Sequence, residues 1–351
     1  MQLLGQTTVE LEAIFQQMGQ PSYRGRQVAH WIYQRGADSF ESMSDLGKNL
    51  RQSLAQTHQL QFPHIANEAR SRDGSIKYLL EMQDGERIET VFLPYDKRVS
   101  VCVSSQAGCA MGCKFCATGL GGFRRNLSAA EIISQVLLAV RHTPEKRPSH
   151  IVFMGMGEPL LNLREVLKTI HLMHDEIGIP LRHITVSTVG VLDAMRRLAD
   201  EKLPVTLAVS LHAPDDDLRQ RLIPTSGKNS VQDIVDAARY YVEQTGRRVS
   251  FEYVVLGGVN DDTGRATQLA ALCRGWPCHV NLIPWNNVPE ASLQGTEFHA
   301  PDRDQLARFR ETLERRGATV TQRVQRGADV AGACGQLRAE RQELVQIGGV
   351  G

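Results

Sequence analysis

Three cysteines, Cys109, Cys113 and Cys116, fall within eight residues of the chain. Closely spaced thiols are typical ligands of iron–sulfur clusters, which usually take four cysteines. Three thiols without an obvious fourth would leave one iron open to an exogenous ligand, and an open iron indicates catalysis rather than electron storage. A structural zinc site is the alternative, but it needs four protein ligands, and the next Cys or His is His142. The spacing therefore favours a catalytic cluster over zinc.

The bulk composition is that of a soluble globular protein, with 351 residues, 23% of them charged, and a formal net charge of +1. This length exceeds that of a usual single domain and predicts one large α/β domain with a small accessory unit. Because the net charge is so small, any nucleic-acid binding must come from local basic patches.

The sequence predicts a cytoplasmic protein that does not enter a membrane. Residues 1–20 lack the basic and apolar regions of a signal peptide, and no run of about 18 apolar residues occurs. The seven cysteines are odd in number and clustered, which argues against the disulfide framework of a secreted protein. We expect reduced thiols with chemical roles.

Residues 1–60 are predicted to form a small helical accessory domain. Apolar residues recur at helical spacing in three stretches: 9–18, 25–35 and 46–56. Ser44 and Asp45 are candidate N-caps of the third helix.

Cations and aromatic rings gather between Tyr23 and Arg35, a mixture that suits contacts to RNA. The alternative is that Trp31 and Tyr33 belong to the core while the arginines cover a solvated face, and residue statistics favour it. Both interpretations stay open at this point.

Residues 61–95 are predicted to form a β-meander that connects the accessory domain to the core. Polar and apolar residues alternate in short runs, and the dipeptides Asp73-Gly74 and Asp84-Gly85 mark hairpin turns. Glu89 lies near the last of these strands.

From residue 96 to about residue 300, strand patterns alternate with helix patterns. Strands are expected at 99–104, 150–155, 183–187, 204–210, 249–255 and 279–284. Helices are expected at 129–142, 163–177, 191–201, 230–244 and 262–275. Six such units joined by right-handed crossovers predict an α/β fold with a parallel sheet that curls into a partial (βα)6 barrel.

Four of the predicted strands end in glycine or polar residues: Gly155 to Pro159, Ser187-Thr188, Ser210-Leu211-His212 and Pro284-Trp285-Asn286. Active groups gather at the carboxyl ends of parallel strands. Glycines let the backbone approach a ligand, and hydroxyl, imidazole and amide groups can bind ribose, amino and carboxylate groups. A turn-forming role is the alternative for each stretch alone, but four on one rim predict a cofactor site.

Residues 301–351 are predicted to form a C-terminal extension with a helix at 302–316 and a strand at 319–323. The extension carries Cys334 among glycine and alanine residues. Small neighbours leave this thiol room to move and to be approached.

The CxxxCxxC spacing on a loop after a strand resembles the radical S-adenosylmethionine (SAM) superfamily, in which the open iron chelates the amino and carboxylate groups of SAM. A closer resemblance, to the RlmN/Cfr family of radical SAM adenosine methyltransferases, runs nearly end to end. It is carried by residues 102–127, 154–162, 210–214 and 333–337. That family modifies one adenosine of large-subunit (23S) rRNA. RlmN acts at carbon 2 and also modifies certain tRNAs, whereas Cfr acts at carbon 8.

The resemblance implies a role for each matched residue. The ligands of a [4Fe-4S] cluster would be Cys109, Cys113 and Cys116. The contacts to SAM, of which two molecules serve each turnover, would come from Gly157, Glu158, Ser187, Ser210, Leu211, His212 and Asn286. The catalytic groups would be Cys334, which carries the methyl group, Cys102, which forms a disulfide with it, and Glu89, which accepts a proton. Cys273 and Cys278 match no catalytic thiol and are expected to be small buried residues.

The implied chemistry needs a radical, because carbons 2 and 8 of adenine are electron-poor and cannot attack the methyl group of SAM. Cys334 would take a methyl group by polar displacement. A radical derived from a second SAM would abstract hydrogen from that methyl group, and the carbon radical would add to adenine. Release of this covalent adduct would need loss of an electron, a base, and attack of Cys102 on the sulfur of Cys334.

The same scheme implies its partners. An external electron donor is required, the target base must leave its stack to be reached, and a monomer is expected. Two alternatives stay open on the sequence alone: Cfr-type methylation of carbon 8, and a non-catalytic iron–sulfur or zinc RNA-binding module. The second would have no use for Cys102 and Cys334.

Overall fold

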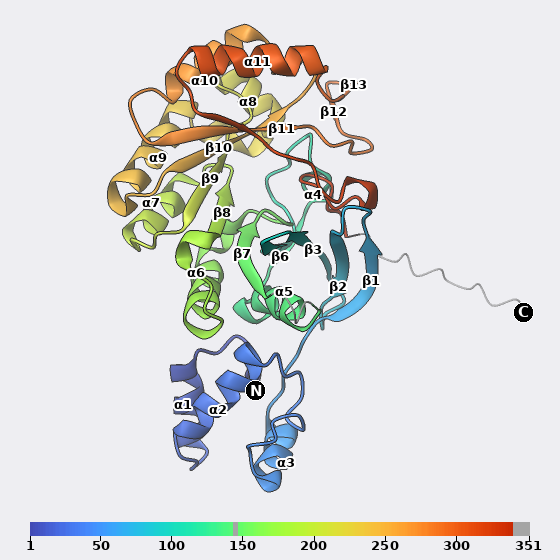
Figure 1. Cartoon of the computed structure of the whole chain (residues 1–351), viewed down its shortest axis with the longest axis vertical. Coiled ribbons are helices and arrows are strands. Elements are labelled where there is room, and N and C mark those ends of the chain that lie inside the picture. The colour runs from blue at the N-terminus through green and yellow to red at the C-terminus, as the bar shows by residue number, and fades with distance from the viewer. Residues whose placement is uncertain (143–146, 340–351) are drawn as a thin grey trace, which may run out of the picture.

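One ten-stranded sheet runs through the computed structural model, which describes residues 1–142 and 147–339. The strand order is β1-β2-β3-β4-β7-β8-β9-β10-β11-β14. Neighbours from β4 to β14 are parallel, whereas β1 to β4 pair antiparallel. Because β1 and β14 do not pair within the described residues, the sheet is a partial barrel, and the predicted fold class is confirmed. Helices α6, α7, α9 and α11 lie along its outer side (Figure 1).

The parallel strands agree closely with the predicted ones. They are β4 Arg98–Cys102, β7 Pro148–Phe153, β8 Ile184–Thr188, β9 Thr206–Ser210, β10 Val249–Val255, β11 Cys278–Pro284 and β14 Val320–Gln322. Every residue of β10 is buried, as expected for a strand that is covered on both faces.

The helices that join these strands were also predicted, apart from α8. They are α5 Ala129–His142, α6 Leu163–His171, α7 Leu192–Asp200, α8 Asp216–Leu222, α9 Val231–Thr245, α10 Thr263–Leu272 and α11 Arg303–Arg315. A π-helical turn, Leu172–Glu176, extends α6. Side-chain caps fix several starts; for example, the Ser230 hydroxyl accepts the N–H of Asp233 at the start of α9.

The N-terminal residues form α1 Thr8–Gln17, α2 Tyr23–Ala29 with a π-helical turn at His30–Gln34, and α3 Lys48–Thr57. The predicted caps of the third helix are wrong, because α3 begins after Gly47 without a side-chain cap. The carboxylate of Asp45 instead accepts the indole N–H of Trp31 at 2.5 Å. Tyr33 is fully buried, as the core interpretation predicted.

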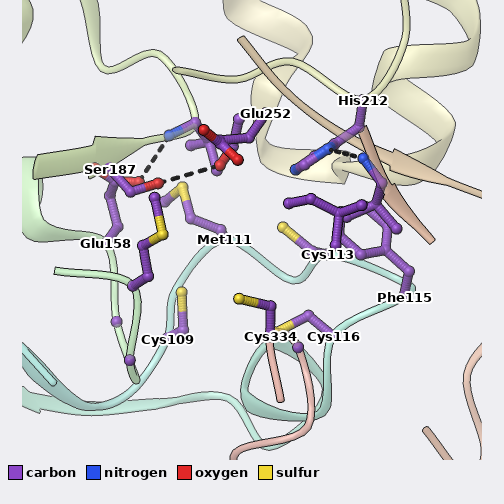
Figure 2. Close-up of a pocket in the computed structure, with 18 of the residues that line it drawn as sticks. Cys109, Met111, Cys113, Phe115, Cys116, Glu158, Ser187, His212, Glu252 and Cys334 are labelled. Carbon is purple, nitrogen blue, oxygen red and sulfur yellow. Dashed lines mark hydrogen bonds between the residues drawn. The ribbon is translucent and has the colours of Figure 1, made fainter. Parts of the chain in front are cut away.

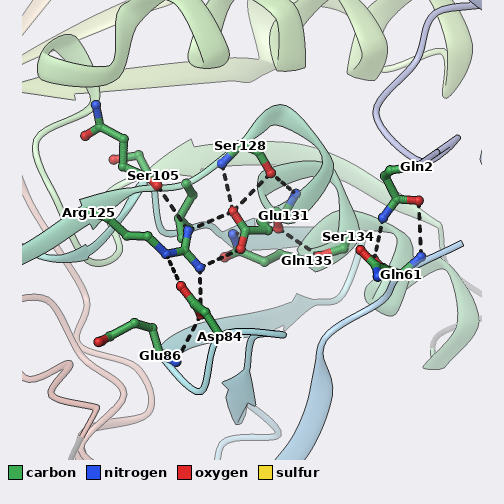
Figure 3. A network of polar contacts seen from close by, with 12 residues as sticks. Gln2, Gln61, Asp84, Glu86, Ser105, Arg125, Ser128, Glu131, Ser134 and Gln135 are labelled. Carbon is green, nitrogen blue, oxygen red and sulfur yellow. Dashed lines mark hydrogen bonds and ion pairs between the residues drawn. The ribbon is translucent and has the colours of Figure 1, made fainter. Parts of the chain in front are cut away.

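This helical module packs directly on the core. The Tyr33 hydroxyl accepts the N–H of Gly5 at 3.1 Å and donates to the carbonyl of Gln6 at 2.6 Å. Gly5 itself lies so close to α5 that a Cβ there would be 2.7 Å from the nitrogen of Ala130. A Gln2–Gln61 pair joins the two ends of the module (Figure 3).

The predicted meander is present as β1 His64–Arg70, β2 Ile76–Glu81 and β3 Arg87–Tyr95. It continues the core sheet, because β3 pairs with β4 with Val91 opposite Cys102. Glu89 therefore emerges on the same face of the sheet as Cys102, two residues along β3. The domain boundaries at residues 60 and 95 stay predictions.

After β14 the chain crosses the open side of the partial barrel to the β1–β2 turn. There the Asp73 carboxylate accepts the N–H of Gly327 at 2.9 Å, and Asp329 accepts the hydroxyl of Ser71 at 2.6 Å. These contacts bring the Cys334 segment over the sheet. The remaining strands form two small hairpins: β5 Gln106–Gly108 with β6 Phe123–Asn126, and β12 Ser292–Leu293 with β13 Thr296–Glu297. A short helix, α4 Ala117–Leu120, follows the last cysteine of the loop. No helix in the described ranges has the length and apolar character needed to span a membrane.

Candidate active site

A pocket opens at the carboxyl ends of the parallel strands. Ten of the predicted site residues line it: Cys109, Cys113, Cys116, Gly157, Glu158, Ser187, Ser210, His212, Asn286 and Cys334. Figure 2 shows the sulfurs of the cysteines on one side of this hollow and Glu158, Ser187 and Glu252 on the other. The fold thus brings the cysteine loop and the polar strand ends together, as the sequence predicted.

The cysteine loop is closed at its base by the β5–β6 hairpin. Gly108 has φ +73°, and a Cβ there would lie 1.9 Å from the carbonyl oxygen of Gly122, so only glycine fits this approach. Arg125 on β6 fixes the hairpin by binding Glu131 of α5 at 2.7 Å and Asp84 of the β2–β3 turn at 3.0 Å (Figure 3). The loop between Cys109 and Cys116 therefore stands on a well-anchored base.

Several features of the pocket fit a cluster held by thiolates. The backbone amide of Met111 opposes the rise in the pKa of Cys109 that burial causes, and those of Gly119 and Thr118 oppose the rise in the pKa of Cys116. Hydrogen bonds to cysteine sulfurs are among the groups that tune iron–sulfur clusters. Burial raises the pKa of Cys109 to about 12 and raises that of Cys113 well above its usual value. These thiols would hold protons until a metal replaced them.

A buried cation lies behind the cysteine loop. Arg219 of α8 is 1% exposed, donates to the carbonyls of Val189 and Ser210, and has an Nε without a hydrogen-bond partner. Burial lowers the pKa of Arg219 to about 10, so it stays charged at neutral pH. Its charge opposes the rise in the pKa of Cys113. A positive charge at this place suits a group bound by three thiolates.

The number of thiols bears on the choice of metal. Cys109, Cys113 and Cys116 line one pocket. A structural zinc ion takes four protein ligands, whereas three thiols on a [4Fe-4S] cluster leave one iron open to a substrate. The donor set therefore fits a cluster better than a structural zinc ion.

Gly157 and Glu158 form a tight turn after β7. Gly157 has φ +103°, and a Cβ there would lie 2.6 Å from Cβ of Gln106. The Glu158 carboxylate accepts the N–H of Leu160 at 3.0 Å and that of Val189 at 2.9 Å. Burial raises the pKa of Glu158 to about 7. A cationic group in the pocket, such as an amine, would favour its ionised form.

Ser187 and Ser210 lie side by side at the ends of β8 and β9, with their hydroxyl oxygens 3.3 Å apart. His212 follows them with φ +60°, and its Nδ1 accepts the N–H of Val254 at 3.0 Å. Burial, helped by the charge of Arg219, lowers the pKa of His212 to about 3. The ring is therefore neutral, with its proton on Nε2, and serves as a hydrogen-bond donor rather than as an acid.

The last two predicted SAM contacts, Asn286 and Leu211, have different positions relative to the pocket. The amide nitrogen of Asn286 donates to the carbonyl of Cys334 at 3.0 Å, which ties the sixth predicted strand to the Cys334 segment. Leu211 does not line the pocket and is fully buried, with its N–H bonded to the carbonyl of Glu252 at 3.0 Å.

Cys334 lines two cavities. Besides the main pocket, it borders a second cavity with Cys102, Met154 and Arg323. Burial, and then the charge of Cys334, raise the pKa of Cys102 to about 12, whereas the charge of Arg323 opposes that rise. Cys334 therefore lies between the cysteine loop and Cys102, whose thiol is protonated.

Glu89 lies apart from both cavities, in a third that it shares with Lys77, Ala331, Gln336 and Arg338. Its side chain is buried, and the Cys334 segment separates it from the thiols. The predicted base is therefore near the site but not in contact with it.

Sequence reasoning missed several charged groups of the site: Lys77, Arg219, Glu252 and Arg323. The carboxylate of Glu252 lines the main pocket and accepts the hydroxyl of Ser250 at 2.6 Å and the amide of Asn281 at 2.7 Å. A charged residue inside a mostly apolar strand, as Glu252 is in β10, was the available signal for this group.

Known proteins share the fold and much of the sequence. Residues 103–270 match the family model of the radical SAM superfamily, and residues 1–60 match that of the ribosomal RNA large subunit methyltransferase N-terminal domain. A radical SAM methyltransferase from Sphaerobacter thermophilus has a similar structure, with a TM-score of 0.92 and 45% sequence identity over 97% of this chain and 100% of that one. The sheet, the cysteine loop and these matches define a radical SAM enzyme.

Proteins of similar sequence identify the family of radical SAM enzymes to which this chain belongs. A protein named probable dual-specificity RNA methyltransferase RlmN from Prochlorococcus marinus (strain NATL2A) is 47% identical over 98% of this chain and 96% of its own length. The protein of that name from Synechococcus sp. (strain CC9311) is 48% identical over 97% and 98%. This chain belongs to the RlmN family of radical SAM RNA methyltransferases.

The chain is therefore an enzyme, and the predicted resemblance is confirmed, whereas the alternative of a non-catalytic binding module is wrong. Membership in the family implies SAM and a [4Fe-4S] cluster as cofactors. The role of each individual residue stays a prediction.

Proposed function

We propose that this enzyme methylates carbon 2 of one adenosine in 23S rRNA and of an adenosine in tRNA. The observation that carries the proposal is the position of Cys334, which borders both the pocket of the three-cysteine loop and the cavity of Cys102. A methyl carrier needs both neighbours, one for the radical step and one for release. The names of the RlmN relatives favour carbon 2 over the carbon 8 of Cfr.

In this proposal Cys109, Cys113 and Cys116 would hold the cluster, which would supply an electron for the reductive cleavage of SAM. Gly157 and Glu158 receive the amino group of SAM, since Glu158 is the carboxylate of the turn after β7.

The remaining predicted contacts would hold the rest of SAM. The hydroxyls of Ser187 and Ser210, which share one hydrogen bond, and the Nε2–H of His212 line the pocket and can bind ribose and carboxylate oxygens. Asn286 positions the Cys334 segment through the carbonyl of Cys334. Leu211 would act only through its backbone and its packing.

Cys334 takes the methyl group as a thiolate, releasing its proton, and presents the methyl group toward the pocket. Cys102 stays protonated in the resting enzyme because its pKa is raised. It acts last: after losing its proton, its thiolate attacks the sulfur of Cys334, the bond between that sulfur and the methylene carbon breaks, and the carbon takes up a proton from solvent, which leaves a disulfide and the free methylated base. An external reductant then restores both thiols. A monomeric enzyme in the cytoplasm, where thiols are kept reduced, suits this cycle.

The N-terminal module is proposed to contact the RNA. Tyr23 is 44% exposed, and the guanidinium of Arg24 stacks over its ring at 4.8 Å. The guanidinium of Arg35 stacks over Trp31 at 4.4 Å. These two stacked cations present charge and aromatic surface together, as single-stranded RNA recognition requires.

Replacing both Arg24 and Arg35 with Gln is expected to weaken RNA binding about tenfold and to lower the salt dependence of binding by about one unit of slope per lost phosphate contact. RNA-independent SAM cleavage should stay unchanged. Fluorescence anisotropy with a labelled RNA at several salt concentrations measures the effect. Arg26→Gln is the matched control, because Arg26 is already paired with Glu12. Equal affinity in the double variant and the control would remove this surface from the RNA interface.

The function itself is tested by nucleoside analysis. Reconstituted enzyme, SAM and a reductant are incubated anaerobically with unmodified 23S rRNA or tRNA, and the digested nucleosides are separated and identified by mass spectrometry. We expect 2-methyladenosine from both RNAs. Only 8-methyladenosine would assign the chain the chemistry of Cfr, and a product from rRNA alone would limit the substrate range.

A further inference from the structure

Both oxygens of the Glu89 carboxylate are occupied. Oε1 lies 2.8 Å from Nζ of Lys77, and Oε2 accepts the backbone N–H of Arg338 at 2.8 Å. The side chains of Lys77 and Glu89 are only 16% and 6% exposed. Removing one partner of such an ion pair leaves the other charge buried and uncompensated. Lys77 is thus the side chain that holds this buried carboxylate in place.

Strand register explains why this lysine reaches this carboxylate. Lys77 of β2 lies opposite Val91 of β3, and Glu89 stands two residues before Val91. Diagonal neighbours on one face of a sheet are within reach of long side chains. Val91 in turn lies opposite Cys102 of β4. Lys77, Glu89 and Cys102 therefore emerge on one face.

The carrier segment, residues 331–338, separates Glu89 from the thiols. On one side, Ala333, Cys334 and Leu337 border the cavity of Cys102. On the other, Ala331, Gln336 and Arg338 border the cavity of Glu89. Nζ of Lys77 also donates to the carbonyl of Ala331 at 3.3 Å. An adenine held at Cys334 can meet Glu89 only if the segment gives up its bond to Oε2.

We propose that Lys77 is the positioning residue of the base, and that Oε2 of Glu89 is the oxygen that accepts the proton once the carrier segment withdraws the N–H of Arg338. Lys77 stays bound to Oε1 throughout, so the carboxylate keeps its orientation when Oε2 is released. This inference rests on the proposed function and deepens it. It assigns a role to Lys77, which does not line the predicted cofactor pocket.

The proton transfer is balanced as follows. After the carbon radical has added to carbon 2, one electron passes to a one-electron acceptor of the iron–sulfur class. The C–H bond at carbon 2 then breaks, its electron pair stays in the ring and restores aromaticity, and the proton forms an O–H bond at Oε2. Because recovered aromaticity makes this C–H bond acidic, the base needs to be in place rather than strong. The ion pair with Lys77 holds it in place.

The test compares Lys77→Met, which removes the charge, with Lys77→Arg, which keeps it. Reconstituted enzymes are assayed for methylation of Cys334 by protein mass spectrometry, for 5'-deoxyadenosine, for covalent RNA adduct on denaturing gels, and for free methylated RNA. Lys77→Met should methylate Cys334 and form the radical normally but accumulate adduct, with release of product at least about tenfold slower, since a positioned base contributes that much or more. Lys77→Arg should recover most of the rate.

An isotope effect separates positioning from folding. RNA with deuterium at carbon 2 of the target adenine should slow product release further in Lys77→Met, because proton removal has become limiting. Lys168→Met is the control, since Lys168 forms an ion pair of similar length, 2.9 Å to Glu10, but a more exposed one, with the two side chains 31% and 43% exposed, and it borders none of the cavities of the thiols and Glu89. It should behave like the wild type.

Two results would overturn the inference: release by Lys77→Met at the wild-type rate, or loss of Cys334 methylation together with adduct, which is what a purely structural lysine predicts. Lys77→Gln repeats the test should the Met variant not fold, and failure of both to methylate Cys334 counts against the proposal. If the wild type itself made no methylated RNA, the proposed function would fail, independently of Lys77.

Discussion

Cys102→Ala enzyme is expected to accumulate as a covalent complex with RNA, joined through Cys334. Cys102 borders the cavity of Cys334 but not the pocket of the cysteine loop, so its loss should spare methylation of Cys334, radical formation and addition to adenine. The adduct then has no route of release. Free methylated RNA should fall on the order of 10³-fold or more, the scale seen when a nucleophile is removed. Denaturing gels with labelled RNA measure the complex.

The control for this experiment uses the order in which the two thiols react, with Cys334 before Cys102. Cys334→Ala should form neither adduct nor product, and the double variant should match it, because the carrier acts first. The complex should survive thiol reductants, since it is held by a C–S bond rather than by a disulfide. Were Cys102 only a buried strand residue, Cys102→Ala would lose some stability and release methylated RNA at a normal rate.

Cys113→Ala is expected to abolish SAM cleavage together with the brown colour of the reconstituted enzyme. Each thiol of the loop would bind a different iron, so a missing ligand exposes the cluster to loss. The effect should be complete in both readouts, visible absorbance and 5'-deoxyadenosine.

Cys273→Ala is the matched control for this experiment. Cys273 is also buried, at 9% exposure, but lies at the end of α10 and borders no part of the pocket. It should keep its cluster and its activity. A full cluster in Cys113→Ala would contradict the assignment of the ligands.

Much of the fold could be predicted because the relevant signals are local. Six strands of β-branched and apolar residues alternate with amphipathic helices, and this pattern alone places the ends of β7, β8, β9 and β11 on one rim. The cysteine loop follows β4, so it had to lie on the same rim. Motif and topology together therefore predicted the main pocket.

The missed features depend on contacts between distant parts of the chain. The β5–β6 hairpin has strands of three and four residues, too short to show a period. α8 is a seven-residue helix rich in charged residues, which resembles a loop, and so Arg219 behind the cysteines was not expected. The Lys77–Glu89 pair follows from strand register, which no local pattern specifies. The path of the chain after β14 decides which side of the Cys334 segment faces Glu89.

The most direct test of a methyl carrier on Cys334 is the isotopic composition of the methyl group in the product. Enzyme whose Cys334 is unmethylated at the start is incubated with RNA and with SAM that carries a fully deuterated methyl group. The mass of 2-methyladenosine from the digested RNA is then measured by mass spectrometry. If Cys334 carries the methyl group and loses one hydrogen atom to the radical, the product methyl should hold two deuterium atoms and one hydrogen from solvent. The deuterium lost should appear in 5'-deoxyadenosine. A product that retained all three deuterium atoms would mean direct transfer from SAM and would contradict the account.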